Sequence, residues 1–265
     1  MPHFDSIASG YDLTFTHTEI GKRQRAAVYS VLEKILSDHQ IKNVLELNCG
    51  TGEDAIFFAQ KGLQVLATDI SPEMVRVATL KAEQKGVSHL LRTQVVAFQE
   101  LHQVENFPRY DLIFSNFGGL NCLPPEDYPY FVNNIERLLN PGGFFVAVVM
   151  PRFCLWETLY FSGRGKFRQA FRRVSREPVS ARLDDSTSVK TWYYSPKDMK
   201  NSFKGWVLGD VRPIGLFIPP SYLEPFFRKR IAFLDRLENM ERSTARFRTL
   251  AGMADHFLLV LEKKA

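Results

Sequence analysis

The sequence predicts an α/β fold with a doubly wound, mostly parallel sheet of seven strands and helices on both faces. Apolar segments typical of strands begin at residues 44–52 and recur at 64–69, 110–116 and 139–149, with helical patterns between them. The first segment ends in an acid and runs into a turn with two glycines that opens a helix. This order of strand, glycine turn and helix is typical of the ligand-binding edge of such a sheet.

The other elements follow from helix starts and residue spacing. Residues 19–38 carry apolar side chains at helical spacing and are predicted to form a long helix. Ser71 and Ser195 each precede a proline, which is typical of the first residues of a helix. Residues 205–217 and 254–262 have the pattern of the last two strands, which completes a sheet of seven.

A chain of 265 residues with 45% hydrophobic content can bury the core of one such domain. We predict a single domain in four parts. These are an N-terminal helical cap (1–40), a cofactor-binding core (41–150), a lid or substrate insertion with helical character (151–195), and the last part of the sheet (196–265) with a second insertion at 219–252. Loops grafted on a generic sheet carry specificity, so we expect the first insertion to define the substrate.

The charges around the first turn indicate the type of cofactor. Gly50, Gly52 and Ala55 satisfy the dinucleotide fingerprint, so a nicotinamide-dependent oxidoreductase is one alternative. A pyrophosphate would, however, be repelled by Glu46 and by the two acids in the first helical turn. S-adenosylmethionine carries an ammonium and a sulfonium and no phosphate, so it suits an acid-lined turn better. Asp69, 19 positions after Gly50, has the spacing of a carboxylate that binds ribose hydroxyls.

Taken in order, these motifs resemble a class I S-adenosylmethionine-dependent methyltransferase of the small-molecule type, which has a Rossmann-like fold. The resemblance covers about residues 40 to 150 and the terminal strands. It implies that the first turn wraps the amino-acid part of the cofactor, that Asp69 binds the ribose, and that S-adenosylhomocysteine is the product. It further implies that Asn116 lies beside the methyl-transfer centre. The residues that the resemblance assigns to the turn and to the edge of the adenine are Glu46, Leu47, Asn48, Cys49, Gly50, Gly52, Ile70 and Met74.

Two positions depart from the family pattern. Asn48 replaces a glycine, and because asparagine tolerates positive φ we expect the turn to survive. After the third strand the family often carries an aspartate for the adenine amino group, whereas this chain has Ala97, Phe98 and Gln99. Ala97 cannot make that bond, so Gln99, Glu100 or the Phe98 backbone is expected to contact the base. A protein that binds the cofactor without catalysis is therefore a second alternative.

The N-terminal segment is expected to fold over the cofactor, as in many methyltransferases that the chain resembles. Tyr11 is a candidate contact for the methionine end and Arg25 for its carboxylate. Methyl transfer needs mainly positioning in a water-poor pocket. If the acceptor is a phenol, alcohol or amine, a proton must leave, and His17, Glu157 or Tyr160 is then the candidate base.

The insertion at 151–195 has an apolar aromatic part followed by a basic part. Phe167, Ala170, Phe171 and Val174 recur at helical spacing among arginines, which predicts a basic amphipathic helix. Three interpretations stay open: a helix packed on the core, a cap over an apolar acceptor whose arginines meet an acidic group, and a surface that rests on anionic lipid. In the second insertion, apolar residues from Phe226 to Leu237 indicate another helix.

Charge and cysteine usage narrow the partners and the compartment. A net charge of +5 permits lipid or nucleic-acid binding, but the chain has no recognised nucleic-acid module, so nucleic acid is not the expected partner. Three cysteines without paired spacing indicate neither a disulfide framework nor a zinc site, and no metal is expected. The N-terminus lacks a signal-peptide pattern, so we expect a cytoplasmic monomer or homodimer. The predicted function is methyl transfer to a small, partly apolar, acidic or lipid-like acceptor.

Overall fold

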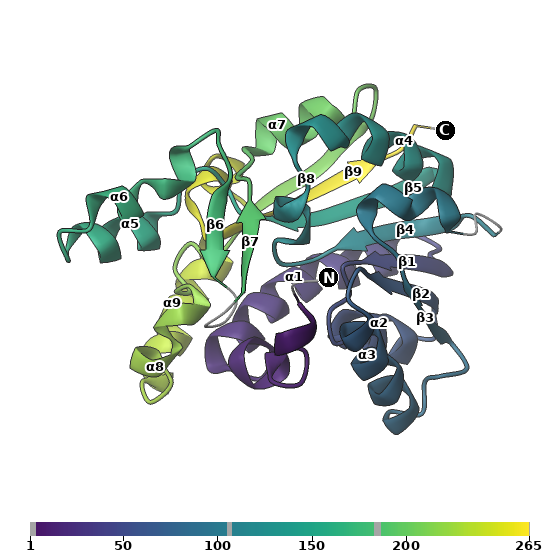
Figure 1. The fold of residues 1–265 in the computed structure, drawn as a ribbon, viewed down its shortest axis with the longest axis horizontal. Helices are drawn as coiled ribbons and strands as arrows, with labels where there is room; N and C mark the ends of the chain where they lie inside the picture. Colours follow the sequence, from purple (N-terminus) through teal and green to yellow (C-terminus); the bar gives the residue numbers. More distant parts are fainter. Residues whose placement is uncertain (1–3, 105–107, 183–186, 265) are drawn as a thin grey trace.

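The computed structural model describes residues 4–104, 108–182 and 187–264. A seven-stranded sheet forms its centre, in the order β3-β2-β1-β4-β5-β9-β8 (Figure 1). The strands of this sheet are β1 (Asn43–Leu47), β2 (Gln64–Asp69), β3 (Leu91–Val95), β4 (Tyr110–Ser115), β5 (Leu139–Val149), β8 (Val207–Ile214) and β9 (His256–Glu262). Only β9 runs against the others, so the predicted seven-stranded, mostly parallel sheet is confirmed.

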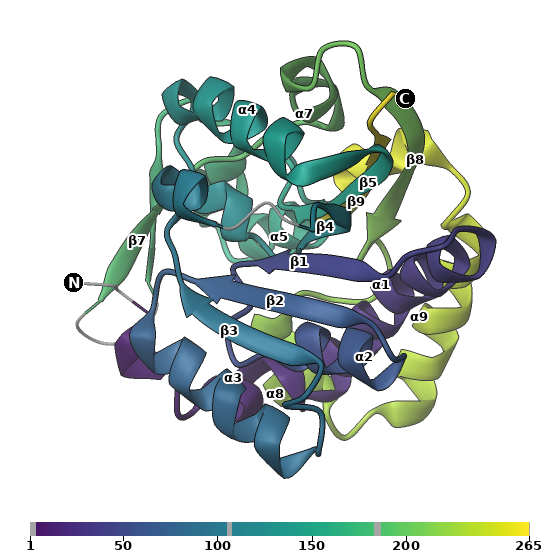
Figure 2. The same cartoon turned by 90° about the vertical axis from the view of Figure 1, so that its right-hand side faces the viewer.

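Helices cover both faces of the sheet. α4 (Tyr128–Leu138) and α7 (Pro196–Ser202) lie on one face, and α1 (Glu19–Asp38), α2 (Glu53–Gln60) and α3 (Pro72–Gln84) lie on the other (Figure 2). Side chains of successive strand residues point to opposite faces. Leu45 accordingly belongs to the core under α4 and Val44 to the core under α1 and α2.

The strand order reverses between β1 and β4, and this places the site. β1 pairs with β2 on one side and with β4 on the other, both in parallel, so that Leu47 lies opposite Ser115. In open α/β sheets, ligands bind beyond the carboxyl ends of the strands at such a switch point. The residues that follow β1, β2 and β4 therefore meet at one edge.

Several local predictions are confirmed. The helix predicted at 19–38 is α1, and Thr18 caps it by accepting the Gly21 N–H. The Ser71 hydroxyl accepts the Met74 N–H at 3.1 Å and starts α3. The Ser195 hydroxyl accepts the Asp198 N–H at 3.1 Å and starts α7. The strand predicted at 205–217 is shorter and covers only β8.

The first insertion differs from its prediction. It contains α5 (Leu155–Ser162), α6 (Phe167–Ala170), a 3-10 turn (Arg172–Val174) and a two-stranded sheet of β6 (Val179–Arg182) and β7 (Ser188–Thr191). The prediction of one amphipathic helix packed by its apolar side is wrong, because Phe171 and Val174 are exposed while Arg173 is buried. α5 and α6 project from the body (Figure 1). Closure of these helices over the site, as a lid requires, stays a prediction.

The second insertion contains two helices, α8 (Glu224–Phe227) and α9 (Ile231–Thr244), rather than one. Leu234 and Leu237 are buried in a third apolar cluster with Ile20 of α1 and Phe227 of α8. This cluster attaches the insertion to the N-terminal helix. No helix in the described ranges is long and apolar enough to span a membrane.

Candidate functional site

The turn after β1 has the backbone geometry that its sequence predicts. Asn48 has φ 46° and Gly50 φ 52°, so asparagine does tolerate the left-handed conformation here. Its side chain also ties β1 to β4, since its Oδ1 accepts the Ser115 hydroxyl at 2.6 Å and its Nδ2 donates to the Asn116 carbonyl at 2.8 Å. A Cβ on Gly52 would lie 2.7 Å from the Ala78 Cβ, which explains that glycine.

Asp69 closes the second strand and holds the two neighbouring turns. Its Oδ2 accepts the Gly50 N–H at 2.8 Å and its Oδ1 accepts the Ser71 N–H at 2.9 Å. Burial raises the pKa of Asp69, although these backbone donors partly offset the effect. Each carboxylate oxygen can accept a second hydrogen bond. The geometry therefore allows Asp69 to accept bonds from the two hydroxyls of a ribose.

Glu46 is a buried carboxyl group with an unused atom. Glu46 is 1% exposed, and its Oε2 has no hydrogen-bond partner among the described residues. Burial and then the nearby Asp54 raise the pKa of Glu46 well above its ordinary value. An unpartnered buried acceptor of this kind is costly. It is the type of group that a bound ammonium would satisfy.

Arg25 is within electrostatic reach of Glu46 and forms a buried ion pair with Asp54. The same aspartate accepts the Tyr29 hydroxyl at 2.8 Å and the Asn116 Nδ2 at 2.9 Å. Arg25 was expected to meet the carboxylate of the cofactor, and the structure pairs it with a protein carboxylate instead. Its Nε nevertheless has no partner among the described residues. Arg25 therefore has an unused donor and Glu46 an unused acceptor, and an amino-acid group has the charges to fit both.

The N-terminal segment binds both turns of this edge. Asp12 accepts the Thr51 hydroxyl at 2.6 Å and the Lys81 ammonium at 2.8 Å. Asp5 accepts from the Ser71 hydroxyl and, at 3.3 Å, from the Glu73 N–H. The segment also brings in Tyr11, whose ring would lie 3.9 Å from a Cβ on Gly50.

The Tyr11 hydroxyl is within electrostatic reach of Arg25 and Asp69, and burial raises its pKa to about 12. Tyr11 and Arg25 are therefore placed at the predicted edge. Their contacts with the cofactor stay predictions.

The residues predicted to contact adenine differ in exposure and in their partners. Met74 is buried and Ile70 is half exposed at the end of β2. Phe98 packs edge-on against Phe131 with ring centroids 5.6 Å apart, so its side chain belongs to the core. Gln99 donates to Asp127 at 2.9 Å, and the Ala97 N–H is bound by Glu100. The contacts of these residues with the base stay predictions.

The structure separates the predicted catalytic residues. Asn116 is at the edge, but its amide is used by Asp54 and by the Phe117 N–H. Glu157 is buried and its carboxylate accepts hydrogen bonds from Arg172 and Arg173, which speaks against a role as base. Tyr160 lies on α5 with the Arg164 guanidinium 3.8 Å above its ring. His17 is exposed at the end of a π-helical turn (Asp12–Thr16).

His256 is a residue that sequence reasoning missed. It begins β9, and because β9 is antiparallel its first residue reaches the carboxyl edge of the other strands. The ring is buried and meets Phe117 edge-on at 5.4 Å. Its Nδ1 lies 3.4 Å from Asp255 Oδ2 and has no hydrogen bond within the described ranges. The sequence places His256 inside the strand predicted at 254–262, but no motif marks it.

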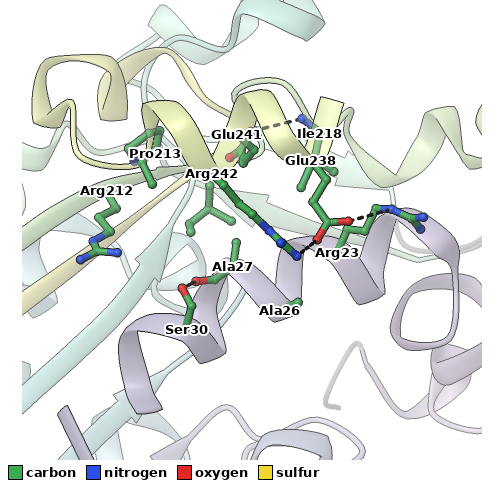
Figure 3. Close-up of a pocket in the computed structure, with 12 residues that line it drawn as sticks. Arg23, Ala26, Ala27, Ser30, Arg212, Pro213, Ile218, Glu238, Glu241 and Arg242 are labelled. Atoms are coloured by element: carbon green, nitrogen blue, oxygen red, sulfur yellow. Dashed lines mark hydrogen bonds and ion pairs between the residues drawn. The ribbon is translucent and has the colours of Figure 1, made fainter. Parts of the chain in front are cut away.

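A pocket of about 190 Å³ lies elsewhere, between α1, β8 and α9 (Figure 3). Its charged side chains are already engaged. Arg23 pairs with Glu238 at 3.2 Å, Arg212 pairs with Asp210 at 2.6 Å, and Glu241 accepts four backbone N–H groups from residues 215–218. This pocket contains none of the predicted site residues, and we do not assign it to the cofactor.

The chain is similar to known methyltransferases. Residues 44–143 match a family model described as a methyltransferase domain. The chain is 30% identical over 156 residues to a demethylmenaquinone methyltransferase of Thermus thermophilus, which covers 56% of this chain and 64% of the relative. It is 29% identical over 202 residues to a malonyl-[acyl-carrier protein] O-methyltransferase of Hamiltonella defensa, covering 73% of this chain and 69% of the relative.

Solved structures share the fold over nearly the whole chain. The CcbJ methyltransferase of Streptomyces caelestis aligns with a TM-score of 0.63 at 18% identity, covering 100% of this chain and 99% of that one. The DhpI complex with S-adenosylhomocysteine aligns with a TM-score of 0.59 at 17% identity, covering 99% and 94%.

The fold and the edge define a Rossmann-like cofactor-binding domain. The matched residues include the glycine turn, Asp69 and β4, and over them the chain is similar to class I S-adenosylmethionine-dependent methyltransferases. S-adenosylmethionine is the cofactor of those enzymes, and the unused Glu46 and Arg25 atoms fit its amino-acid group. The match favours S-adenosylmethionine over the nicotinamide alternative.

Substitution of Glu46 by glutamine is expected to separate binding from stability. The pKa of Glu46 is raised in the folded protein. Between the ordinary pKa and the raised one, Glu46 is therefore more protonated in the folded state than in the unfolded state, and the free energy of unfolding falls as pH rises through this range. Glutamine removes this dependence, so the variant should equal or exceed the parent in stability at pH 8. Its affinity for S-adenosylhomocysteine should fall about tenfold or more, since a charged hydrogen bond is lost.

Thermal unfolding between pH 4.5 and 8, together with calorimetric titration, checks both parts. Unchanged affinity would show that Glu46 does not meet the ammonium group.

Proposed function

We propose that this chain is an S-adenosylmethionine-dependent methyltransferase that acts on a small, partly apolar acceptor of acidic or lipid-like character. The observation that carries the proposal is the pair of buried, unpartnered atoms, Glu46 Oε2 and Arg25 Nε, at the edge where Glu46 is within electrostatic reach of Arg25 and Asp69. The chain spans 64% of the length of the first relative above. The relatives' names give different acceptors, among them demethylmenaquinone and malonyl-[acyl-carrier protein], so the acceptor is argued from the site.

Aromatic rings support an apolar acceptor. Phe117 follows Asn116 directly and has φ 40°, an uncommon value for a bulky residue. Its ring contacts Phe15 at 4.9 Å and His256 at 5.4 Å, and the Arg25 guanidinium lies 5.3 Å from its centroid. These groups come from the N-terminal segment, β4 and β9. They surround the position beside Asn116 where the family resemblance puts methyl transfer.

When bound, S-adenosylmethionine supplies a methyl group on a positively charged sulfur. The residues of this chain would position the acceptor in line with that carbon and exclude water, which provides most of the rate. If the acceptor is a hydroxyl or an amine, its proton moves to His256 Nε2 as the bond to carbon forms. The Asp255 carboxylate beside Nδ1 favours the tautomer whose Nε2 has a free lone pair. A carboxylate acceptor needs no base.

Substitution of His256 by glutamine tests this role. We expect kcat for a hydroxyl or amine acceptor to fall about 100-fold, which is the lower limit of the usual rate contribution of a general base. The affinity for S-adenosylhomocysteine should be unchanged. His89→Gln is the matched control, since His89 is exposed and is not among the predicted site residues, and should keep full activity. Equal rates for the parent and His256→Gln would exclude His256 as the base.

The proposal as a whole is tested by titration with S-adenosylmethionine, S-adenosylhomocysteine and NAD, followed by a screen of apolar acids, phenols and lipids for methylated product. Binding of the two adenosyl ligands with a methylated product supports the enzyme. Binding without any product across the screen favours the second candidate, a cofactor-binding protein without catalysis. This second candidate is retained because the side chains of Asn116 and Glu157 already form hydrogen bonds within the protein.

A further inference from the structure

The hairpin of α5 and α6, residues 155–176, exposes an unusual number of large apolar side chains. Leu159 is 62% exposed, Phe167 62%, Phe171 51% and Val174 56%. Single exposed apolar residues are normal on a protein surface, but a cluster marks an interaction site. Four of them lie within 16 residues of sequence, on a part that projects from the body (Figure 1).

Basic residues share this hairpin. Arg164, Lys166, Arg168 and Arg176 are exposed, and no acidic residue occurs between Gly163 and Arg176. Lys166, Arg168 and Arg176 form no ion pair with any residue in the described ranges. The hairpin therefore carries uncompensated positive charge beside its apolar side chains.

The exposure is fixed by the structure of the hairpin. Ala170 is buried and its carbonyl accepts the Thr158 hydroxyl at 3.2 Å, which holds α6 on α5. At the end of the hairpin, Arg172 and Arg173 bind Glu157, and Arg173 also binds Asp255 at the start of β9. With its arginine pair turned inward, the segment leaves Phe171 and Val174 on the outside. The ion pairs thus stabilise a conformation that presents apolar groups to solvent.

A second group of the same composition lies next to the hairpin. Phe226 is 57% exposed, Ile231 and Phe233 are more than 40% exposed, and the three basic residues 228–230 join α8 to α9. Two aromatic rings of α5 contact this insertion. The Tyr160 ring centroid lies 5.6 Å from that of Tyr222, and the Trp156 ring centroid lies 5.9 Å from that of Phe227. α8 and the hairpin lie at the same end of the molecule (Figure 1).

We propose that this surface, residues 159–176 with residues 226–233, docks on an anionic lipid bilayer. Aromatic and aliphatic side chains enter the interfacial zone while lysine and arginine meet lipid phosphates. A second copy of the chain would bring like charges together, which disfavours self-association through this surface. The proposal goes beyond the proposed function, because docking on lipid needs neither the cofactor nor catalysis.

Vesicle sedimentation tests the proposal on the full chain. The protein should bind vesicles of phosphatidylcholine with 30% phosphatidylglycerol, should bind pure phosphatidylcholine at least about tenfold more weakly, and should lose binding as salt is raised. Phe167→Ser with Phe171→Ser, and separately Lys166→Glu with Arg168→Glu, should each weaken binding about tenfold or more. Unchanged S-adenosylhomocysteine binding shows that each variant is folded.

Matched controls carry the same chemical changes elsewhere. Leu80→Ser with Val95→Ser removes two exposed apolar residues, and Lys34→Glu with Lys85→Glu makes the same change in net charge. These should bind vesicles like the parent. Equal losses in the controls, or no binding to the anionic vesicles, would overturn the proposal. Concentration-dependent dimers that disappear with Phe167→Ser and Phe171→Ser would overturn it in favour of a second copy.

Discussion

Replacement of Asp69 by alanine is expected to lower the affinity for S-adenosylmethionine and S-adenosylhomocysteine by about 10²- to 10⁴-fold. Two hydrogen bonds from ribose hydroxyls to a carboxylate contribute about 1.5–3 kcal/mol each. The carboxylate also holds the N–H groups of Gly50 and Ser71, so alanine loosens both turns of the cofactor edge. Calorimetric titration of the parent and the variant measures the effect.

Asp69→Asn is the control for this prediction, because it keeps the size of the side chain and one acceptor oxygen. Its affinity should lie between those of the parent and the alanine variant. Similar unfolding temperatures would show that the turns survive. If the alanine variant binds both ligands like the parent, the assignment of Asp69 to the ribose is wrong.

Replacement of Arg173 by alanine is expected to lower the free energy of unfolding by about 3–5 kcal/mol, the cost of leaving buried carboxylates without their partner. Arg173 is 4% exposed and donates to Glu157 at 3.0 Å and to Asp255 at 2.8 Å. Although burial raises the pKa of Asp255, His256 and Arg173 lower it below its ordinary value, so this carboxyl is charged in the folded protein.

Arg172→Ala is the matched control, with the same change one residue away. The Arg172 side chain is 34% exposed and, within the described ranges, forms an ion pair with Glu157 alone, so its loss should cost no more than about 1 kcal/mol. Denaturant titrations of both variants give the comparison. Equal and small losses would show that the buried cluster does not stabilise the hairpin.

The sequence predicts the sheet well because its signals are local. The serines that start α3 and α7 bind N–H groups three residues away, and the turn after β1 depends on the φ values of Asn48 and Gly50. The seven strands and their mostly parallel arrangement follow from the alternation of strand and helix patterns along the chain. Each of these requires only neighbouring residues or general topology.

The insertion at 151–195 could not be predicted in the same way. Helical spacing of Phe167, Phe171 and Val174 suggested a buried stripe, yet Glu157 and Asp255 bind the arginines and turn the segment the other way. Asp255 is 82 residues from Arg173, so this pairing has no local signal. His256 was missed for the same reason. Its neighbour Phe117 lies in the turn after β4, 139 residues earlier in the chain.

The N-terminal segment lies outside the matched domain but contributes to the cofactor edge. The match to the methyltransferase domain begins at residue 44, but Asp5, Asp12 and Arg25 bind the turns that form the cofactor edge. The stretch that the family model covers therefore does not complete its own ligand-binding edge. A fragment cut at the family border would expose Ser71, Thr51 and Asp54 without their partners, so expression or transplantation of this domain has to start before residue 5.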